Sequence, residues 1–244
     1  TGVTASFDPT VDLLPSTDYT ATITTGAKNL AGTPLAINYV WHFTTNTTIN
    51  PGPVVLNTAA RFGILAGVGV SNNAGFSVIN NMDVGIYPGV RSSVTGFPPA
   101  IIVNGALYAS DDITPPGTPA MLLQAKTDLT NAYLAAEAAV SPAPVSVSGD
   151  LGGLTLAPGI YKSTSTLAIG NGNLTLDAQG NPNAFWIFQI ASGFTTVGGA
   201  GGSVILIGGA QAKNVYWQTG SSATIGDYTS FQGNILALTS ITMN

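Results

Sequence analysis

The residues that most often carry enzyme chemistry are scarce in this sequence. Cysteine is absent, and His42 is the only histidine among 244 residues. Beyond position 42 the chain can therefore form neither a Ser-His-Asp triad nor a metal site built on histidine or cysteine. Carboxylates are the remaining route to an enzyme in that part of the chain.

The carboxylates are scattered along the chain. Asp111 and Asp112 are adjacent, but they precede the segment ITPPGTP, which favours a solvated turn over an acid/base pair. Four further aspartates, in Gly-rich turns without the spacing of a calcium loop, suit hydrogen bonds to nearby backbone. They are Asp83, Asp150, Asp177 and Asp227. We therefore expect no enzyme activity, no catalytic residue, no cofactor and no metal site.

Hydroxyl side chains that recur on short strands offer a different chemistry. The segments GFTTVGG, SSATIGD and TSITMN alternate in polarity, and each follows a longer apolar run. Alternate side chains of a strand share one side, so stacked strands would present two outward columns. We expect one column to contain Thr166, Phe194, Ser222 and Ser240. We expect the other to contain Ala168, Thr196, Thr224 and Thr242.

The same alignment predicts which side chains point inward. They are Thr195 and Val197, Ala223 and Ile225, and Ile241 and Met243. Phe194 is the awkward outward member, because an aromatic ring interrupts a plane of small side chains. The spacing between successive strands is uneven, which indicates an irregular solenoid with loops of variable length.

Apolar strands and one helix must position these columns. The runs NAFWIFQI, KNVYWQTG and GNILALTS are apolar at nearly every position, as in strands buried on both faces. Their aromatic residues are expected in the core and in contacts with the helix. A helix of about 20 residues is predicted from Leu122, Ala125, Leu129, Ala132 and Ala136, which recur at helical spacing. Thr118 is its expected N-cap, before a first-turn proline.

The first residues have a different pattern. The segments LLPSTDYTATITTG and YVWHFTT consist of short alternating runs broken by turns, which is typical of a β-sandwich. They resemble the closing half of a bacterial Ig-like repeat. We predict the C-terminal part of an Ig-like domain over residues 1–46, with its first strands upstream, a linker over 47–55, and a larger domain over 56–244.

Charge argues against two classes of partner. Only 7% of residues are charged and the formal net charge is −5, so the chain lacks the basic surface that binds nucleic acid or anionic membranes. No apolar run is long enough to span a bilayer. The Gly-rich run VGGAGGSV also lacks the Lys-Ser/Thr pair of a phosphate-binding loop.

The larger domain resembles a known family at several segments. They include LNTAARFGILAGVGVSN, SSVTGFPPAIIVNGALYASD, NLTLDAQGNPNAFWIFQIAS and FQGNILALTSITMN. The resemblance is to bacterial and fungal ice-binding (antifreeze) proteins. It implies a mainly β fold, an irregular right-handed β-solenoid with one long α-helix packed alongside. Members usually continue past ITMN, so we expect residues 56–244 to lack the last rung of the solenoid.

The resemblance gives the hydroxyl columns a ligand. Ice is a neutral, periodic lattice, and threonine suits it because its side chain is stiff and carries both a hydroxyl and a methyl group. In this family the N-terminal coil stacks against later coils, so Ser93 and Thr95 could extend the ice-binding face. A second, less uniform face would contain Thr175, Asp177, Tyr228 and Ser230.

The function implied is adsorption to ice, with inhibition of ice growth and of recrystallisation, outside the cell. The chain would be secreted or displayed at the cell surface, as a monomer or as a module of a larger surface protein. Two alternatives remain open at this point. One is a solenoid that binds or cleaves polysaccharide, which the shortage of basic residues disfavours, and the other is a structural adhesin module.

Overall fold

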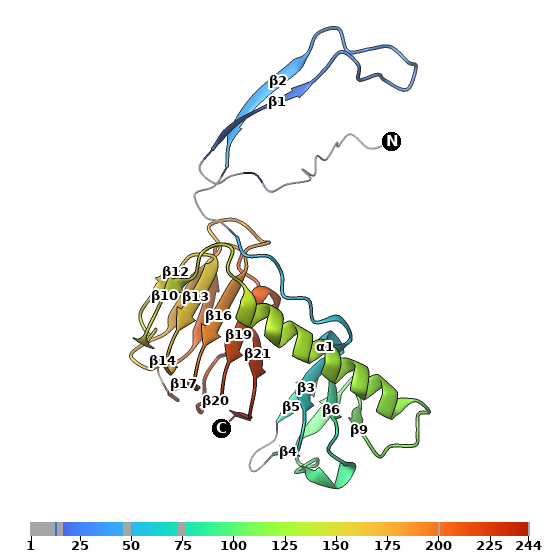
Figure 1. The fold of residues 1–244 in the computed structure, drawn as a ribbon, viewed down its shortest axis with the longest axis vertical. Coiled ribbons are helices and arrows are strands. Elements are labelled where there is room, and N and C mark those ends of the chain that lie inside the picture. The colour runs from blue at the N-terminus through green and yellow to red at the C-terminus, as the bar shows by residue number, and fades with distance from the viewer. Residues whose placement is uncertain (1–12, 14–16, 46–49, 73–76, 200, 244) are drawn as a thin grey trace.

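The computed structural model describes residues 13, 17–45, 50–72, 77–199 and 201–243. Within these ranges the chain forms one long α-helix and 22 strands, together with three short 3-10 helices. Every pairing between named strands is parallel except that of the first two strands. The fold is therefore mainly β and built as a solenoid (Figure 1), as the sequence predicted.

The first two strands form a hairpin that stands apart from the rest of the molecule (Figure 1). Strands β1 (Asp18–Ile23) and β2 (Tyr39–Thr44) pair antiparallel. Tyr19 lies opposite Phe43 and the two rings stack. Part of the predicted Ig-like segment, at residues 1–12 and 14–16, and residues 46–49 of the predicted linker lie outside the described residues.

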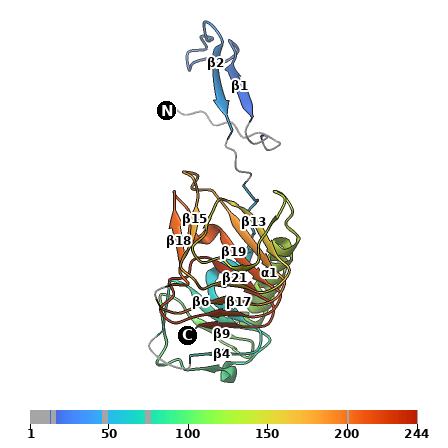
Figure 2. The ribbon, with the colours of Figure 1, turned by 90° about the vertical axis from the view of Figure 1, so that its left-hand side faces the viewer.

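The C-terminal part of the chain winds into a stack with three sides (Figure 2). The helix-facing sheet contains β10 (Val145–Ser146), β13 (Gly159–Ser163), β16 (Trp186–Ile190), β19 (Val215–Thr219) and β21 (Asn234–Ala237). The threonine sheet contains β11 (Gly149–Asp150), β14 (Leu167–Ile169), β17 (Phe194–Thr196), β20 (Ala223–Ile225) and β22 (Ile241–Met243). The third sheet contains β12 (Thr155–Leu156), β15 (Leu174–Asp177) and β18 (Val204–Ile207).

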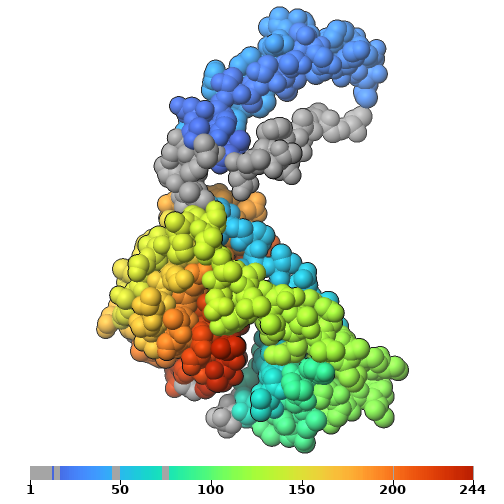
Figure 3. Space-filling view, viewed as in Figure 1, coloured from blue at the N-terminus to red at the C-terminus, as the bar shows by residue number. Residues whose placement is uncertain are grey.

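A shorter stack precedes it in the chain. Its first, second and third sides follow one another in the same order as the helix-facing sheet, the threonine sheet and the third sheet of the larger stack. The first side contains β3 (Phe62–Ala66), β6 (Asp83–Ile86) and β9 (Leu107–Ala109). The second side contains β4 (Val70–Ser71) and β7 (Val94–Thr95), and the third contains β5 (Val78–Asn80) and β8 (Ile101–Val103). The 3-10 helices are η1 (Asn57–Arg61), η2 (Arg91–Ser93) and η3 (Ala212–Asn214). In the described part of the chain, β3 and β21 each end a sheet, and Figure 3 shows a hollow between the stacks beside the helix.

Helix α1 (Thr118–Ala138) packs on both stacks. Leu122 and Ala125 pack with Phe62 of the N-terminal stack, whereas Ala132 and Ala136 pack with the C-terminal stack. The predicted helix is therefore present, but its N-cap is Gly117 with φ 86°, and Thr118 lies inside the helix, where its hydroxyl donates to the Pro115 carbonyl. Gly117 takes the cap position because this left-handed conformation favours glycine.

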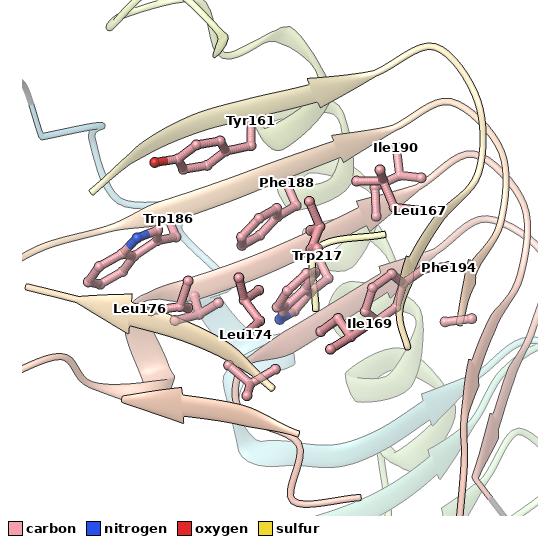
Figure 4. Packing of buried hydrophobic residues seen from close by; sticks show 14 of the residues in the cluster. Tyr161, Leu167, Ile169, Leu174, Leu176, Trp186, Phe188, Ile190, Phe194 and Trp217 are labelled. Atoms are coloured by element: carbon pink, nitrogen blue, oxygen red, sulfur yellow. The ribbon is translucent and has the colours of Figure 1, made fainter. Parts of the chain in front are cut away.

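The core of the C-terminal stack is a column of aromatic rings (Figure 4). The ring of Phe188 stacks on Trp217 with centroids 3.9 Å apart, and Phe194 stacks on Trp217 at 4.7 Å. Trp186, Phe188, Phe194 and Trp217 are all fully buried. These rings hold successive rungs in register, and they decide which residues of the threonine sheet point inward.

Candidate functional site

The outward side of the threonine sheet carries one continuous column of small side chains. Strand pairing places Ala168 beside Thr195, Thr195 beside Thr224, and Thr224 beside Thr242. We call these four residues the threonine column. Thr195 and Thr242 are exposed, whereas Ala168 and Thr224 are half-buried. Neighbouring strands of a parallel sheet are about 4.8 Å apart, so the three hydroxyls repeat at a fixed interval.

The prediction that Thr196 belongs to this column is wrong. Thr196 is 5% exposed, and its hydroxyl lies within the stack, where it accepts from the Gly226 N–H at 2.9 Å and contacts the Thr229 hydroxyl at 3.2 Å. The alternation of this strand is shifted by one residue because the Phe194 ring enters the aromatic core. Thr195 consequently takes the outward position that the sequence alignment assigned to Thr196.

The second predicted column changes for the same reason. Phe194 is buried, so its predicted outward position falls to Gly193, which lies between Thr166 and Ser222. The hydroxyl of Ser240 donates to that of Ser222 at 2.9 Å, which links two rungs of this column. The resulting hydroxyl column contains Thr166, Ser222 and Ser240, with a gap one side chain wide at Gly193.

Three more inward predictions fail at the margins of the sheet. Val197 is 44% exposed, because the shift that turns Thr195 outward also turns Val197 outward. Ile241 and Met243 are 46% and 65% exposed, because β22 is the end strand of its sheet and nothing described covers its outer edge. Ala223 and Ile225 are buried as predicted.

A carboxylate ends the threonine column at its first rung. Asp150 pairs with Ala168, but its side chain accepts hydrogen bonds from the backbone N–H groups of Gly152, Gly170 and Asn171, each at 2.8 Å. These bonds, that of Gly152 first, hold the pKa of the carboxyl below its ordinary value. The hydrogen bonds thus stabilise the ionised carboxylate, and the rungs beyond Ala168 present no charged residue in either column.

The N-terminal stack carries the two remaining predicted site residues. Thr95 lies on β7 and is exposed, whereas Ser93 ends η2 and is half-buried. Thr95 belongs to the second side of its stack, which corresponds to the threonine sheet of the larger stack, and Ser93 directly precedes β7. Figure 1 shows β4 on the same side of the molecule as β17 and β20.

The second candidate face is less regular than the first. Thr175 pairs with Thr155 and with Ile205, so its column mixes hydroxyl and apolar side chains. Asp177 accepts from the Gln179 N–H, and Tyr228 is 93% exposed. Ser230 is exposed beyond β18. A carboxylate, a phenol and two isoleucines, Ile205 and Ile207, therefore interrupt this face.

Two further aspartates, Asp112 and Asp128, serve the structure. Asp112 pairs with Arg91, and this contact lowers the pKa of the Asp112 carboxyl. Asp128 of α1 accepts from the hydroxyl and the backbone N–H of Thr58, which lowers its pKa as well. Over the described ranges, no three His, Cys, Asp or Glu side chains gather as metal ligands would. No helix in the same ranges has the length and apolarity needed to cross a bilayer.

Comparison with known proteins matches both parts of the chain. Residues 1–45 match the bacterial Ig-like domain family, and residues 64–244 match the family described as ice-binding-like. The ice-binding protein of Nostoc sp. (strain HG1) is 46% identical over 189 residues, covering 78% of this chain and 64% of that protein. Ice-binding protein 1 of Shewanella frigidimarina is 38% identical, covering 77% of this chain and 23% of that protein.

Structural neighbours agree with these relatives. The ice-binding protein 1 domain of Shewanella frigidimarina aligns with a TM-score of 0.74 at 31% identity, over 80% of this chain and 96% of that domain. An ice-binding protein from an Antarctic biological consortium aligns with a TM-score of 0.70 at 41% identity, over 80% and 90% of the two chains. The matched family covers most of the chain, including the threonine sheet and α1, and the chain belongs to the ice-binding-like family.

Proposed function

We propose that this chain adsorbs to ice through the outward side of the threonine sheet and thereby inhibits ice growth and recrystallisation. The observation that carries the proposal is the in-register ladder of Thr195, Thr224 and Thr242 beside Ser222 and Ser240. The relatives that carry the name ice-binding protein also support this proposal.

The physics of the ladder suits a neutral lattice. Threonine has a restricted χ1, so hydroxyls on successive strands keep a fixed spacing and lose little freedom on binding. Their methyl groups leave adjoining water free to order, and no charged group beyond Ala168 in the two columns holds a competing hydration shell. Ser93 and Thr95 add hydroxyls on the same side of the N-terminal stack.

We further propose that the chain acts by adsorption and not as an enzyme, and that it works outside the cell, secreted or displayed. The Ig-like segment over residues 1–46 would serve as a spacer, joined by residues 47–55 to the ice-binding domain over 56–244. Ice is the ligand that the uncharged columns favour over a polysaccharide, because the face offers no paired carboxylates or cations to recognise sugars.

The test is thermal hysteresis and ice-crystal shape measured on the purified chain, with Thr224→Tyr as the variant. A tyrosine at the middle of the threonine column would raise a ring above the plane, so we expect unfaceted crystals and loss of most of the freezing gap.

Thr155→Tyr is the matched control, because Thr155 is exposed on a strand of the third sheet. It should behave like the unmodified chain. Retention of the full gap by folded Thr224→Tyr would assign the activity to another face, and loss of the gap only in Thr155→Tyr would place it on the third sheet.

A further inference from the structure

A cleft of about 260 Å³ lies where the last turn of α1 meets the helix-facing sheet. Glu137 of the helix lines it, together with Lys162 of β13, Gln189 of β16 and Gln218 of β19. Strand pairing sets Lys162 beside Gln189, and Gln189 beside Gln218. No residue of the threonine column or of the hydroxyl column lines this cleft, so its polar side chains belong to a separate place on the molecule.

Two opposite charges flank the cleft without pairing. Glu137 and Lys162 are both exposed, and within the described ranges neither side chain forms an ion pair. Glu137 is the next-to-last residue of α1, where the carbonyl end of the helix dipole also favours a cation. The cleft therefore suits a positive group beside Glu137 and a negative group beside Lys162.

Gln189 adds an acceptor that no donor meets. Its side chain is 3% exposed, its Nε2 donates to three carbonyls at the end of α1, and its Oε1 has no partner among the described residues. Because linked hydrogen bonds polarise one another, donation by Nε2 makes Oε1 a stronger acceptor. The Nε2 of Gln218 is also engaged, by the Tyr133 hydroxyl. The Gln189 amide therefore leaves an acceptor, and a buried acceptor calls for a donor.

We infer that this cleft binds a small zwitterion with a primary ammonium group, of the class of free α-amino acids. The ammonium group lies toward Glu137 and donates an N–H to Oε1 of Gln189, while the carboxylate accepts from Lys162. A quaternary ammonium compound such as glycine betaine carries the same two charges but has no N–H to donate, so the cleft selects against it. Binding of this ligand does not depend on adsorption to ice.

The experiment is a nuclear magnetic resonance titration of the full chain with glycine, followed at the side-chain amide signals of Gln189 and Gln218. We expect both signals to shift and to saturate. Glycine betaine, acetate and methylammonium each lack one part of the recognised group. Each should bind at least about tenfold more weakly than glycine, because each loses a hydrogen bond to a charged group.

Glu137→Gln and Lys162→Gln each remove one charge at an exposed position, and both should weaken glycine binding at least about tenfold. Lys213→Gln, at an exposed position on η3, is the matched control and should leave binding unchanged. Absence of a saturating shift would mean that the cleft holds water only, and would overturn the inference. Glycine betaine binding as tightly as glycine, or full affinity in folded Glu137→Gln and Lys162→Gln, would overturn it as well.

Discussion

At the scale of single residues, one ring decides which hydroxyls reach the surface. Phe194 could face out only by leaving the stack of Phe188 and Trp217, and burial of a phenyl side chain is worth roughly 1.5–3 kcal/mol. Moving a threonine side chain between the inside and the outside of the stack changes the free energy far less. The core therefore selects Thr195 for the surface and leaves Thr196 to bond within the stack.

This selection predicts opposite consequences at two adjacent threonines. Thr195→Tyr should abolish most of the thermal hysteresis and leave stability almost unchanged, because the side chain is exposed. Thr196→Val should keep the hysteresis but lower the free energy of unfolding by roughly 1–3 kcal/mol, because the Gly226 N–H loses its acceptor. Urea unfolding and hysteresis of both variants check this, and loss of hysteresis in folded Thr196→Val would contradict the register.

At the scale of elements, α1 depends on a side chain from the sheet beneath it. The helix ends without a glycine cap, and the Gln189 side-chain amide donates to the carbonyls of Ala136, Glu137 and Ala139 at 2.8, 3.1 and 2.7 Å. Its own Oε1 is buried without a partner. The last turn of the helix is thus satisfied from β16, which ties the helix to the stack.

Gln189→Leu should destabilise the protein by roughly 1–3 kcal/mol, since buried helix carbonyls would lose their donor. Gln218→Leu is the matched control on the neighbouring strand, because Gln218 makes a single bond to the Tyr133 hydroxyl, at 2.8 Å. It should cost about 0.5–1.5 kcal/mol, the net contribution of one hydrogen bond. Chemical unfolding measures both, and a Gln189→Leu chain as stable as the unmodified one would show that the cap is dispensable.

At the scale of the whole molecule, the charged groups support the fold and the proposed face is almost free of them. The pKa values of Asp112, Asp128 and Asp150 are all lowered by hydrogen bonds to Arg91, Thr58 and the Gly152 turn. A carboxyl with a lowered pKa binds fewer protons folded than unfolded. Its contribution to stability is complete above the unfolded value and is lost as the pH falls through the folded value.

We therefore expect the melting temperature to be level above about pH 5 and to fall as the pH drops below about 4, near the unfolded pKa of aspartate. Thermal hysteresis should not change between about pH 5 and 8, because neither column titrates there. Asp150→Asn should reduce the dependence of melting temperature on pH. Calorimetry and hysteresis across this range test both statements, and a freezing gap that varies from pH 5 to 8 in folded protein would contradict the second.

The sequence by itself determined the class of fold. Period-two and apolar runs predicted short stacked strands, the spacing of Leu122, Ala125 and Ala132 predicted the helix, and the scarcity of charge argued against nucleic acid and membranes as partners. These features are local or compositional, so they can be recognised without knowing which distant residues become neighbours in the fold. Thr224 and Thr242 were placed in one column because the segments SSATIGD and TSITMN, each after an apolar run, align with one another.

Only the tertiary structure decided which residues of β17 face outward and which strands pair within the N-terminal stack. A strand of three residues has too few side chains for its own alternation to choose a side, so the choice falls to Trp217, which receives the Phe194 ring. Ser71 lies beside Thr95 because β4 pairs with β7. These strands belong to separate coils, and no local sequence pattern encodes their pairing. Such contacts join residues distant in sequence, and their energies exist only once the coils have stacked.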